Sequence, residues 1–365
     1  MGQLGAWWHM LTSIGPGLRG GRQADTMFRF YVHQSLADLG FFDCLREPRT
    51  YGEILARFGF IDGEYTREVM DTLVKDPRHT LLLNDGHYSL HPQARFPSLD
   101  ETLAKVDPRI RPTISLVEGL KDTVLDRLRE ERIGIAELFE RGEYPLVDRF
   151  NAFVGGSFYS RMRLAVLAIV SPEEKAWLKG KRLLNIGCGS GRETAELWLQ
   201  FGGDIHITAI DAVPGMIEHA EENFETLVDE TCPQHPPVTP ENRPIFKLAS
   251  ATQLPFGDNS FDATFWLLVL HWTSDPRKAI SEAARVVRPG GLHLSCNAFK
   301  PEANPYTDLV IRGHRNSFGF FWREDFRRWF REQGVEADPV TPAGLTCARN
   351  RKDLLPVPAQ GRAPS

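Results

Sequence analysis

Apolar positions recur with two different rhythms in the two halves of this 365-residue chain. From about Met27 to Val154 they recur at helical spacing, which predicts a mainly helical segment. From Leu183 onward, short apolar runs are separated by helix-like stretches, so strands and helices are expected in alternation. Such alternation is typical of a parallel sheet that helices cover on both faces.

The first half opens with three predicted helices, at about residues 28–45, 50–60 and 64–76, with further amphipathic helices around residues 112–132 and 135–141. Thr50 is a suitable N-cap for the second helix, and Glu53 stands in the capping-box position three residues later. The Asp85-Gly86 pair lies between two short apolar runs and predicts a hairpin turn. Three helices followed by a hairpin outline a winged helix.

The second half predicts strands at residues 182–187, 205–211, 245–250, 261–270 and 291–298, with helices at residues 193–201, 214–227 and 276–287. We therefore expect an α/β, Rossmann-like domain at residues 156–350, preceded by a helical domain at residues 26–155. The glycine-rich residues 1–25 are expected to form a mobile arm, and the proline-rich residues 351–365 a disordered tail.

Composition and charge exclude several classes of protein. A net charge of −5 argues against binding to nucleic acid or membranes that is driven by charge. The chain has no apolar run long enough to span a membrane and no signal-peptide pattern at its start. Its five cysteines are scattered, without a CxxC pair, which predicts neither a disulfide framework nor a metal site. A reducing, cytoplasmic location is expected.

The stretch LLNIGCGSG joins a predicted strand to a predicted helix through three alternate glycines, Gly187, Gly189 and Gly191. A strand, glycine-rich turn and helix in this order can hold a polar ligand against backbone N–H groups. The third glycine of a dinucleotide fingerprint would fall at Arg192, whose bulk opposes that packing, and no GKS or GKT follows. The loop is therefore either a site for another nucleotide or a tight turn.

Asp211 ends the second predicted strand, about 20 residues beyond the glycine loop. An acid at this position can accept hydrogen bonds from both ribose hydroxyls of a nucleotide. The alternative is an N-cap for the next helix, which would suit an isolated Asp. The glycine loop before it favours ribose binding.

The ordered set LLNIGCGSG, ITAIDAVPGMIEHA, LPFGDNSFDATF, VLHW and EAARVVRPGGLHLS resembles the class I S-adenosylmethionine-dependent methyltransferases over about Leu183 to Asn297. The resemblance implies a seven-stranded sheet with an antiparallel last strand, and S-adenosylmethionine as cofactor. By this resemblance, the glycine loop would cradle the methionine part of the cofactor and Asp211 would bind its ribose. The residues after the second to fourth strands would flank the adenine and line the pocket. The cofactor-binding residues so implied are Asn185, Gly187, Cys188, Gly189, Gly191, Asp211, Ala212, Met216, Ser250, Ala251, Leu267 and Leu268.

Two of these residues depart from the family pattern. Asn185 stands where the family usually has an acid, and it supplies no charge to the cofactor's ammonium group. Ser250 stands where an Asp is frequent, and would meet the adenine amine with a hydroxyl group. We therefore expect cofactor binding with altered tuning.

The role of His271 is open at this stage. In plant-type small-molecule O-methyltransferases a histidine in a similar element after the fourth strand is the general base, usually within His-Asp-Trp, whereas here Trp272 follows His271 directly. A base is needed only where the acceptor loses a proton. His271 is thus a candidate base or a pocket-wall residue.

The first half resembles the winged-helix dimerisation domain of those O-methyltransferases, which implies a homodimer. A DNA-binding winged helix is the alternative, but its recognition helix, about Arg67–Asp76, mixes acids with bases. A ligand-sensing transcription regulator is accordingly a remote alternative, and no nucleic-acid partner is expected.

The segments FRFYVHQSLADLGFFDCLREPRTYGEILARF and VLDRLREERIGIAELFER look similar to bacterial S-methyltransferases that act on 4-methylthio-2-hydroxybutyrate in dimethylsulfoniopropionate synthesis. A thioether acceptor needs no base, and an arginine suits its carboxylate. The small-molecule acceptor is therefore expected to be methylated at sulfur, or alternatively at oxygen with His271 as base. Candidate catalytic residues are His271, Tyr159 and Arg163, and further candidates are Arg161, Tyr306, His314, Arg315 and Trp322.

Overall fold

The computed structural model describes residues 26–106, 111–130, 133–140, 146–155, 157–300, 303–339 and 344–350. The expected N-terminal arm and C-terminal tail lie outside these residues. The chain forms two compact units, Met1–Arg161 with Pro301–Phe320, and Met162–Lys300 with Phe321–Ser365. None of the helices described is long and apolar enough to cross a membrane.

The first unit is mainly helical, as the spacing of apolar residues predicts. Its helices are residues 26–38, α2 Phe41–Cys44, α3 Tyr51–Phe58, α4 Glu64–Val74, α5 Leu99–Leu103, α6 Arg111–Gly119, α7 Thr123–Leu128, α8 Ile135–Glu140, α9 Leu146–Val154 and α15 Pro305–Gly313; α10, Ser157–Ala168, runs from this unit into the second. A small antiparallel sheet has the order β1 (Arg49–Thr50), β3 (His87–Leu90), β2 (Leu81–Asn84).

Two local predictions in this unit are confirmed. Thr50 caps α3, and its side chain and that of Glu53 complete the capping box in both directions. Strands β2 and β3 pair as a hairpin, with Asp85 at φ 47° and Gly86 at φ 76°, since a two-residue turn of this type needs positive φ at both positions. The winged helix that these elements would form stays a prediction.

Helix α15 follows β8 and β9 of the second unit in sequence, yet it packs into the core of the first. Tyr306, Leu309 and Val310 share that core with residues of α3, α4 and α7. The Tyr65 hydroxyl of α4 donates to the backbone oxygen of Leu309 at 2.7 Å. The insert after the fifth strand thus contributes structure to the helical unit.

The second unit contains a mixed sheet of six strands in the order β11-β8-β7-β4-β5-β6. These strands are β4 Arg182–Ile186, β5 His206–Asp211, β6 Ile245–Leu248, β7 Phe261–Leu267, β8 Val287–Cys296 and β11 Leu345–Arg349. Only β11 is antiparallel to its neighbour, so the antiparallel last strand is confirmed. The expectation of seven strands is wrong for the described residues, because only a single bridge, Val335 to Asn350, pairs beyond β11.

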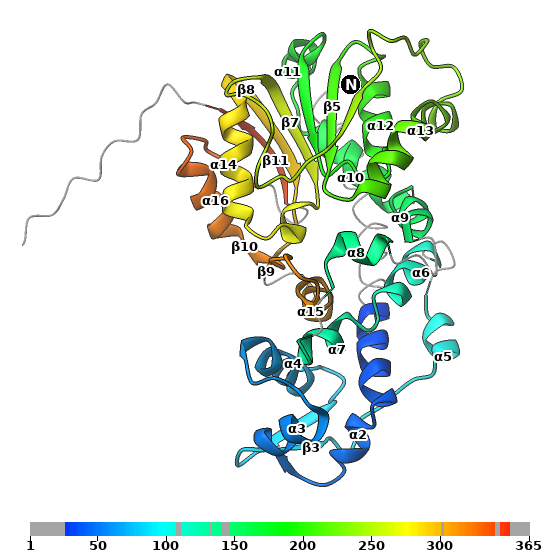
Figure 1. Cartoon of the computed structure of the whole chain (residues 1–365), viewed down its shortest axis with the longest axis vertical. Helices are drawn as coiled ribbons and strands as arrows, with labels where there is room; N and C mark the ends of the chain where they lie inside the picture. The colour runs from blue at the N-terminus through cyan, green and yellow to red at the C-terminus, as the bar shows by residue number, and fades with distance from the viewer. Residues whose placement is uncertain are drawn as a thin grey trace, which may run out of the picture. The chain divides into compact units, whose positions relative to one another are not determined.

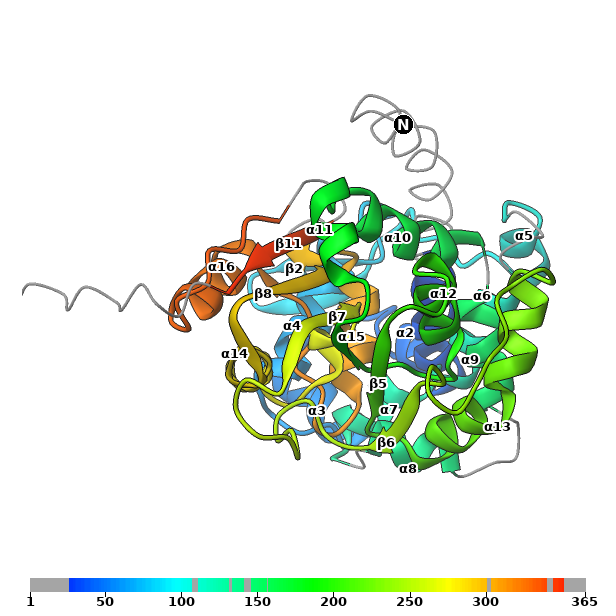
Figure 2. The same cartoon turned by 90° about the horizontal axis from the view of Figure 1, so that it is seen from above.

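Helices cover both faces of this sheet, as Figures 1 and 2 show. Helices α12 (Arg192–Gln200) and α13 (Pro214–Thr231) lie on one face, and α14 (Pro276–Val286) and α16 (Arg323–Arg331) on the other. The unit also contains α11 Pro172–Leu178, the 3-10 turn η2 Leu270–Trp272 and a short parallel pair, β9 Phe299–Lys300 and β10 Phe321–Trp322. On β4, Leu184 and Ile186 pack toward α14 and α16, so Asn185 between them faces α12.

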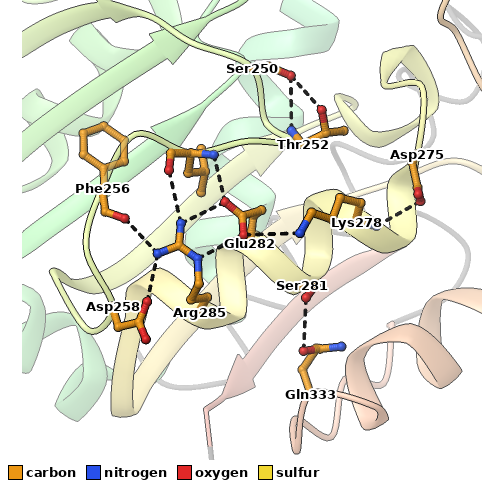
Figure 3. Close-up of polar contacts among 11 residues, drawn as sticks. Ser250, Thr252, Phe256, Asp258, Asp275, Lys278, Ser281, Glu282, Arg285 and Gln333 are labelled. Atoms are coloured by element: carbon orange, nitrogen blue, oxygen red, sulfur yellow. Dashed lines mark hydrogen bonds and ion pairs between the residues drawn. The ribbon is translucent and has the colours of Figure 1, made fainter.

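An arginine on α14 holds the segment between β6 and β7 in place (Figure 3). Arg285 donates to the backbone oxygens of Leu254 and Phe256 at 3.1 and 2.8 Å, and to the carboxylate of Asp258 at 2.9 Å. Glu282 accepts from the backbone N–H of Leu254 at 2.9 Å and pairs with Arg285 at 2.8 Å. The acid and base of EAARVV therefore fix the LPFGD segment that precedes β7.

Replacing this arginine is expected to lower stability. Arg285→Met leaves two backbone oxygens and two carboxylates without their donor, which should lower the free energy of unfolding by about 2 kcal/mol. Arg277→Met is the control, because Arg277 makes an exposed pair with Glu332 and its loss should cost less than about 0.5 kcal/mol. Denaturant unfolding of both variants measures the difference, and equal values would contradict the anchoring role.

Candidate functional site

The loop after β4 is held against the end of β5. The backbone N–H groups of Gly187 and Cys188 both donate to the oxygen of Ile210, at 2.8 and 2.9 Å. The three alternate glycines have φ values of 70°, 53° and 92°, a region that side chains other than glycine rarely occupy. The loop therefore needs glycine at all three positions.

Two of these glycines also make close contacts that leave no room for a side chain. A Cβ atom on Gly187 would lie 2.5 Å from Cγ2 of Val269, just after β7. A Cβ atom on Gly191 would lie 2.9 Å from the Cβ of Ala220 on α13. The glycine loop thus touches the segment after β7 on one side and α13 on the other.

Asp211 joins the loop to the end of β5. Its carboxylate accepts from the backbone N–H of Gly189 at 2.9 Å and from that of Val213 at 3.0 Å. Burial raises the pKa of this carboxyl group, against the effect of the backbone donors. Each carboxylate oxygen has a further lone pair, so Asp211 can still accept from a ligand. The N-cap alternative is wrong, because Val213 is the N-cap of α13 and Asp211 bonds the backbone N–H of that residue; ribose binding by Asp211 stays a prediction.

The other expected cofactor residues lie after the neighbouring strands of the sheet. Ala212 is exposed directly after β5, and Met216 is buried in the first turn of α13. The exposed Ser250 bonds within its own turn, to the backbone N–H and hydroxyl of Thr252, and Ala251 is half-buried beside it. All four follow the carboxyl ends of parallel strands, the edge at which open α/β sheets bind ligands.

After the segments that follow β4, β5 and β6, the fourth segment at this edge of the sheet follows β7. Leu267 is buried, and Leu268 has φ 56°, an uncommon conformation that costs of order 1–3 kcal/mol outside glycine. This turn leads through Val269, which packs on the glycine loop, to His271. The expected pocket residues after the fourth strand therefore belong to the element that contacts the loop.

His271 is buried within η2, two residues after Val269. Burial lowers the pKa of its imidazole to about 3, so the ring is neutral at physiological pH. A neutral imidazole can accept a proton or a hydrogen bond, but this burial makes it a weak base.

A buried polar cluster lies behind the loop, between β4, α10 and α12. Asn185 is fully buried and its Nδ2 donates to the Thr194 hydroxyl at 3.0 Å. Arg163 is only 2% exposed, and Nε and Nη2 donate to the two carboxylate oxygens of Glu196 at 2.6 Å each. Glu193, 7% exposed, has a pKa raised to about 8, chiefly by burial and against the attraction of Arg163. Arg163 thus binds a carboxylate of its own chain.

The remaining candidate residues lie in several environments. The ring of Tyr159 contacts that of Phe153 at 4.6 Å between centroids, within the first unit. Tyr306 is buried there, and its hydroxyl donates to Asp76 at 2.5 Å. His314 is buried, Arg315 pairs with Glu137, Arg161 ends the first unit and Trp322, half-exposed, belongs to the second. Their roles toward an acceptor stay predictions.

Two residues of the site were not among the candidates predicted from the sequence. Val269 is one, because its contact with Gly187 depends on strands that are far apart in sequence. Glu193 is the other, and an acid on the buried face of an amphipathic helix was the signal that could have revealed it. Among the described residues, no group of three His, Cys, Asp or Glu side chains could hold a metal ion.

The arrangement fits the cofactor that the resemblance implies. Asp211 has acceptor capacity for ribose hydroxyls, and the close-packed glycines expose backbone where a methionine tail would lie. Two buried oxygens behind the loop, Oδ1 of Asn185 and Oε1 of Glu193, have no hydrogen-bond partner in the described part of the chain. A cationic ligand is a suitable partner for such oxygens.

Comparisons with known proteins agree with this geometry. The family described as "Methyltransferase domain" matches residues 184–295. O-methyltransferase rstn1 of Aspergillus nomiae is 30% identical over 142 residues, which are 39% of this chain and 57% of that protein. O-methyltransferase cnsE of Penicillium expansum is 25% identical over 211 residues, which cover 54% of this chain and 70% of that protein.

A solved structure resembles the chain over nearly its whole length. The CMeT domain of the citrinin polyketide synthase matches with a TM-score of 0.66 and 14% identity, covering 95% of each chain. At this identity the likeness concerns the fold alone. The chain spans little more than half the length of rstn1, at 57%.

Proposed function

We propose that this S-adenosylmethionine-dependent methyltransferase domain transfers the methyl group to a hydroxyl oxygen of a small organic molecule. The observation that carries the proposal is the contact of Val269 with Gly187, because it brings the segment containing His271 against the cofactor loop. The O-methyltransferases among the relatives support the same acceptor atom.

The cofactor supplies an activated methyl group on a sulfonium, and the chain has to position the acceptor in line with it. Proximity, orientation and exclusion of water contribute much of the rate enhancement of such a displacement. The closely packed segment 267–272 supplies buried walls, and the neutral His271 imidazole receives the hydroxyl hydrogen. His271 would take the O–H proton as the hydroxyl oxygen accepts the methyl group, and because burial lowers the pKa of the imidazole it would release that proton to water afterwards.

A second candidate is S-methylation of a thioether such as 4-methylthio-2-hydroxybutyrate. The low pKa of His271 favours it, since a thioether sulfur attacks without losing a proton. The engagement of Arg163 by Glu196 counts against it, because that arginine was the expected partner for the acceptor's carboxylate. We therefore place oxygen first.

We propose further that the first unit is a winged-helix dimerisation domain of a cytoplasmic homodimer. On α4, Arg67 pairs with Asp62 and Lys75 with Asp71, so these two basic side chains offer little net charge to DNA. This distribution favours pairing with a second copy over a regulator that binds DNA. Sedimentation equilibrium should give twice the mass of the chain, and a monomer at micromolar concentration would exclude the dimer.

The His271→Gln variant distinguishes the two acceptors. With labelled cofactor and a panel of phenols, hydroxy acids and thioethers, we expect transfer to a hydroxyl to fall by roughly 10²–10⁴-fold while cofactor affinity stays unchanged. His206→Gln is the control, since His206 is exposed at the opposite end of β5. A mild loss together with transfer to the thioether would favour sulfur, and no transfer to any hydroxyl compound would contradict the first proposal.

A further inference from the structure

We propose that Glu193 is the acidic residue of the cofactor site, and that its carboxylate binds the ammonium group of the cofactor in place of the acid that Asn185 replaces. The inference rests on the cofactor and is independent of the acceptor proposed above. It also implies that the cofactor's methionine part binds the ionised form of Glu193.

The position of Glu193 is the first support. It is the second residue of α12, directly after the glycine loop, and its side chain turns inward beside Asn185 of β4. Oε1 of Glu193 and Oδ1 of Asn185 are both buried and lack a hydrogen-bond partner within the described residues. Two orphaned acceptors side by side are costly, and an incoming group with several N–H donors would satisfy both.

The charges around Glu193 are the second support. Burial raises its pKa most strongly, Arg163 of α10 lowers it, and the acids Glu196 of α12 and Asp211 of β5 raise it again. Because Arg163 makes its two short bonds to Glu196, its charge is largely compensated by that pair. Within the described residues, Glu193 is therefore a buried acid that the Asn185 side chain bonds and Arg163 attracts, but that forms no ion pair of its own.

The two thiols near Glu193 add no charge to its surroundings. Burial raises the pKa of both Cys188 in the loop and Cys296 at the end of β8, so both thiols are neutral at pH 7. The pKa of the Glu193 carboxyl is raised to about 8, and the group is mostly protonated before the cofactor binds. A bound ammonium lowers this pKa, so binding releases a proton.

Two ligands isolate the contact with the amino acid tail, which carries the ammonium group. S-adenosylhomocysteine has the amino acid tail, whereas 5′-methylthioadenosine shares the adenosine and the sulfur but lacks that tail. In calorimetric titrations, Glu193→Gln should weaken S-adenosylhomocysteine at least tenfold and change 5′-methylthioadenosine less than twofold. Glu230→Gln is the matched control, because Glu230 lies at the surface of α13 and pairs with Arg192, the residue before Glu193 on α12. This variant should bind both ligands as the wild type does.

The pH dependence tests the same contact in the unaltered protein. The pKa of Glu193 falls from about 8 on binding, so affinity for S-adenosylhomocysteine should rise with pH between 6 and 7.5, by up to tenfold per unit. The ligand's own amino group, with a pKa of about 8, stays mostly protonated over this range. Affinity for 5′-methylthioadenosine should stay flat, and titrations in buffers of different ionisation enthalpy should show a proton released only with the first ligand.

A rescue variant shows whether Glu193 binds the ammonium group or only supports the fold of the site. Adding Asn185→Asp to Glu193→Gln returns an acid to the end of β4 and should restore S-adenosylhomocysteine affinity to within about threefold of wild type. Equal weakening of both ligands by Glu193→Gln, or a pH-independent affinity in wild type, would overturn the proposal. Failure of every acceptor in the methylation panel would leave these binding results untouched, so the two proposals fail separately.

Discussion

An alanine at position 187 is expected to weaken cofactor binding strongly. Its Cβ would lie 2.5 Å from Val269, and the backbone at φ 70° disfavours any side chain. The loop cannot retreat, since Gly187 and Cys188 both donate to Ile210. We expect Gly187→Ala to weaken S-adenosylhomocysteine and 5′-methylthioadenosine alike by roughly a hundredfold, about 2.7 kcal/mol of binding free energy.

Gly202 provides the control for this variant. It has φ 62° in the same unit, and no atom lies within 4 Å of the place where its Cβ would be. Gly202→Ala should therefore lose only about 1–2 kcal/mol of stability from the backbone term and bind both ligands normally. Adding Val269→Ala to Gly187→Ala removes the clash and should recover part of the affinity. Normal binding by Gly187→Ala alone would show that the loop is not the cofactor cradle.

The second large effect is expected at Asp211. Asp211→Ala removes the acceptor for the Gly189 and Val213 N–H groups, which should cost roughly 2–4 kcal/mol of stability. It also removes both acceptors available to a ribose. Affinity for S-adenosylhomocysteine and for 5′-methylthioadenosine should therefore fall together by roughly a hundredfold, about 2.7 kcal/mol.

Two further variants show whether Asp211 itself binds the ribose. Asp211→Asn keeps one oxygen acceptor, so its stability and affinity should lie between those of wild type and Asp211→Ala. Asp229→Ala removes an exposed acid of α13, paired with His235, and should leave binding unchanged. If Asp211→Ala lowered the melting temperature yet bound 5′-methylthioadenosine at full affinity, Asp211 would serve the loop and the helix only.

The ligand profiles assign the site residues to parts of the cofactor. The variant at Asp211 should affect both ligands, because both contain the ribose. The variant at Gly187 should affect both as well, because it displaces the loop whose Gly189 N–H group bonds to Asp211. Glu193→Gln should affect only the ligand with an amino acid tail. Titrating the variants at Gly187, Asp211 and Glu193 with the same two ligands therefore compares the three residues directly.

Much of the second unit followed from local sequence patterns. The apolar runs of β4, β5, β7 and β8 and the helical spacing of α12, α13 and α14 specify these elements through burial and backbone preference alone. The three glycines of the loop permit the positive φ values that the structure has there. In the first unit, the capping box of Thr50 and the Asp85-Gly86 turn are local too, because each depends on residues within three positions of one another.

The features that were wrong or missed depend on contacts between distant segments. Among the described residues the sheet has six strands, because the chain near Val335 makes a single bridge to Asn350, and no local pattern limits pairing at a sheet edge. Helix α15 is amphipathic like many others, and only the core of the first unit decides that Tyr306 packs there. The sequence does not indicate which acid pairs with Arg163, because Glu196 reaches it only through the packing of α12 against α10.

The sequence by itself determined the strand and helix order, the glycine loop and the acid Asp211 after the second strand. Only the tertiary structure decided that Val269 packs on Gly187 and that Glu196 pairs with Arg163. It also decided that Glu193 lies buried beside Asn185 with Oε1 lacking a hydrogen-bond partner among the described residues. The physical reason is that backbone conformation and amphipathic spacing are local properties. Burial, and the choice of partner for a buried charge, depend on which distant segments the folded chain brings together.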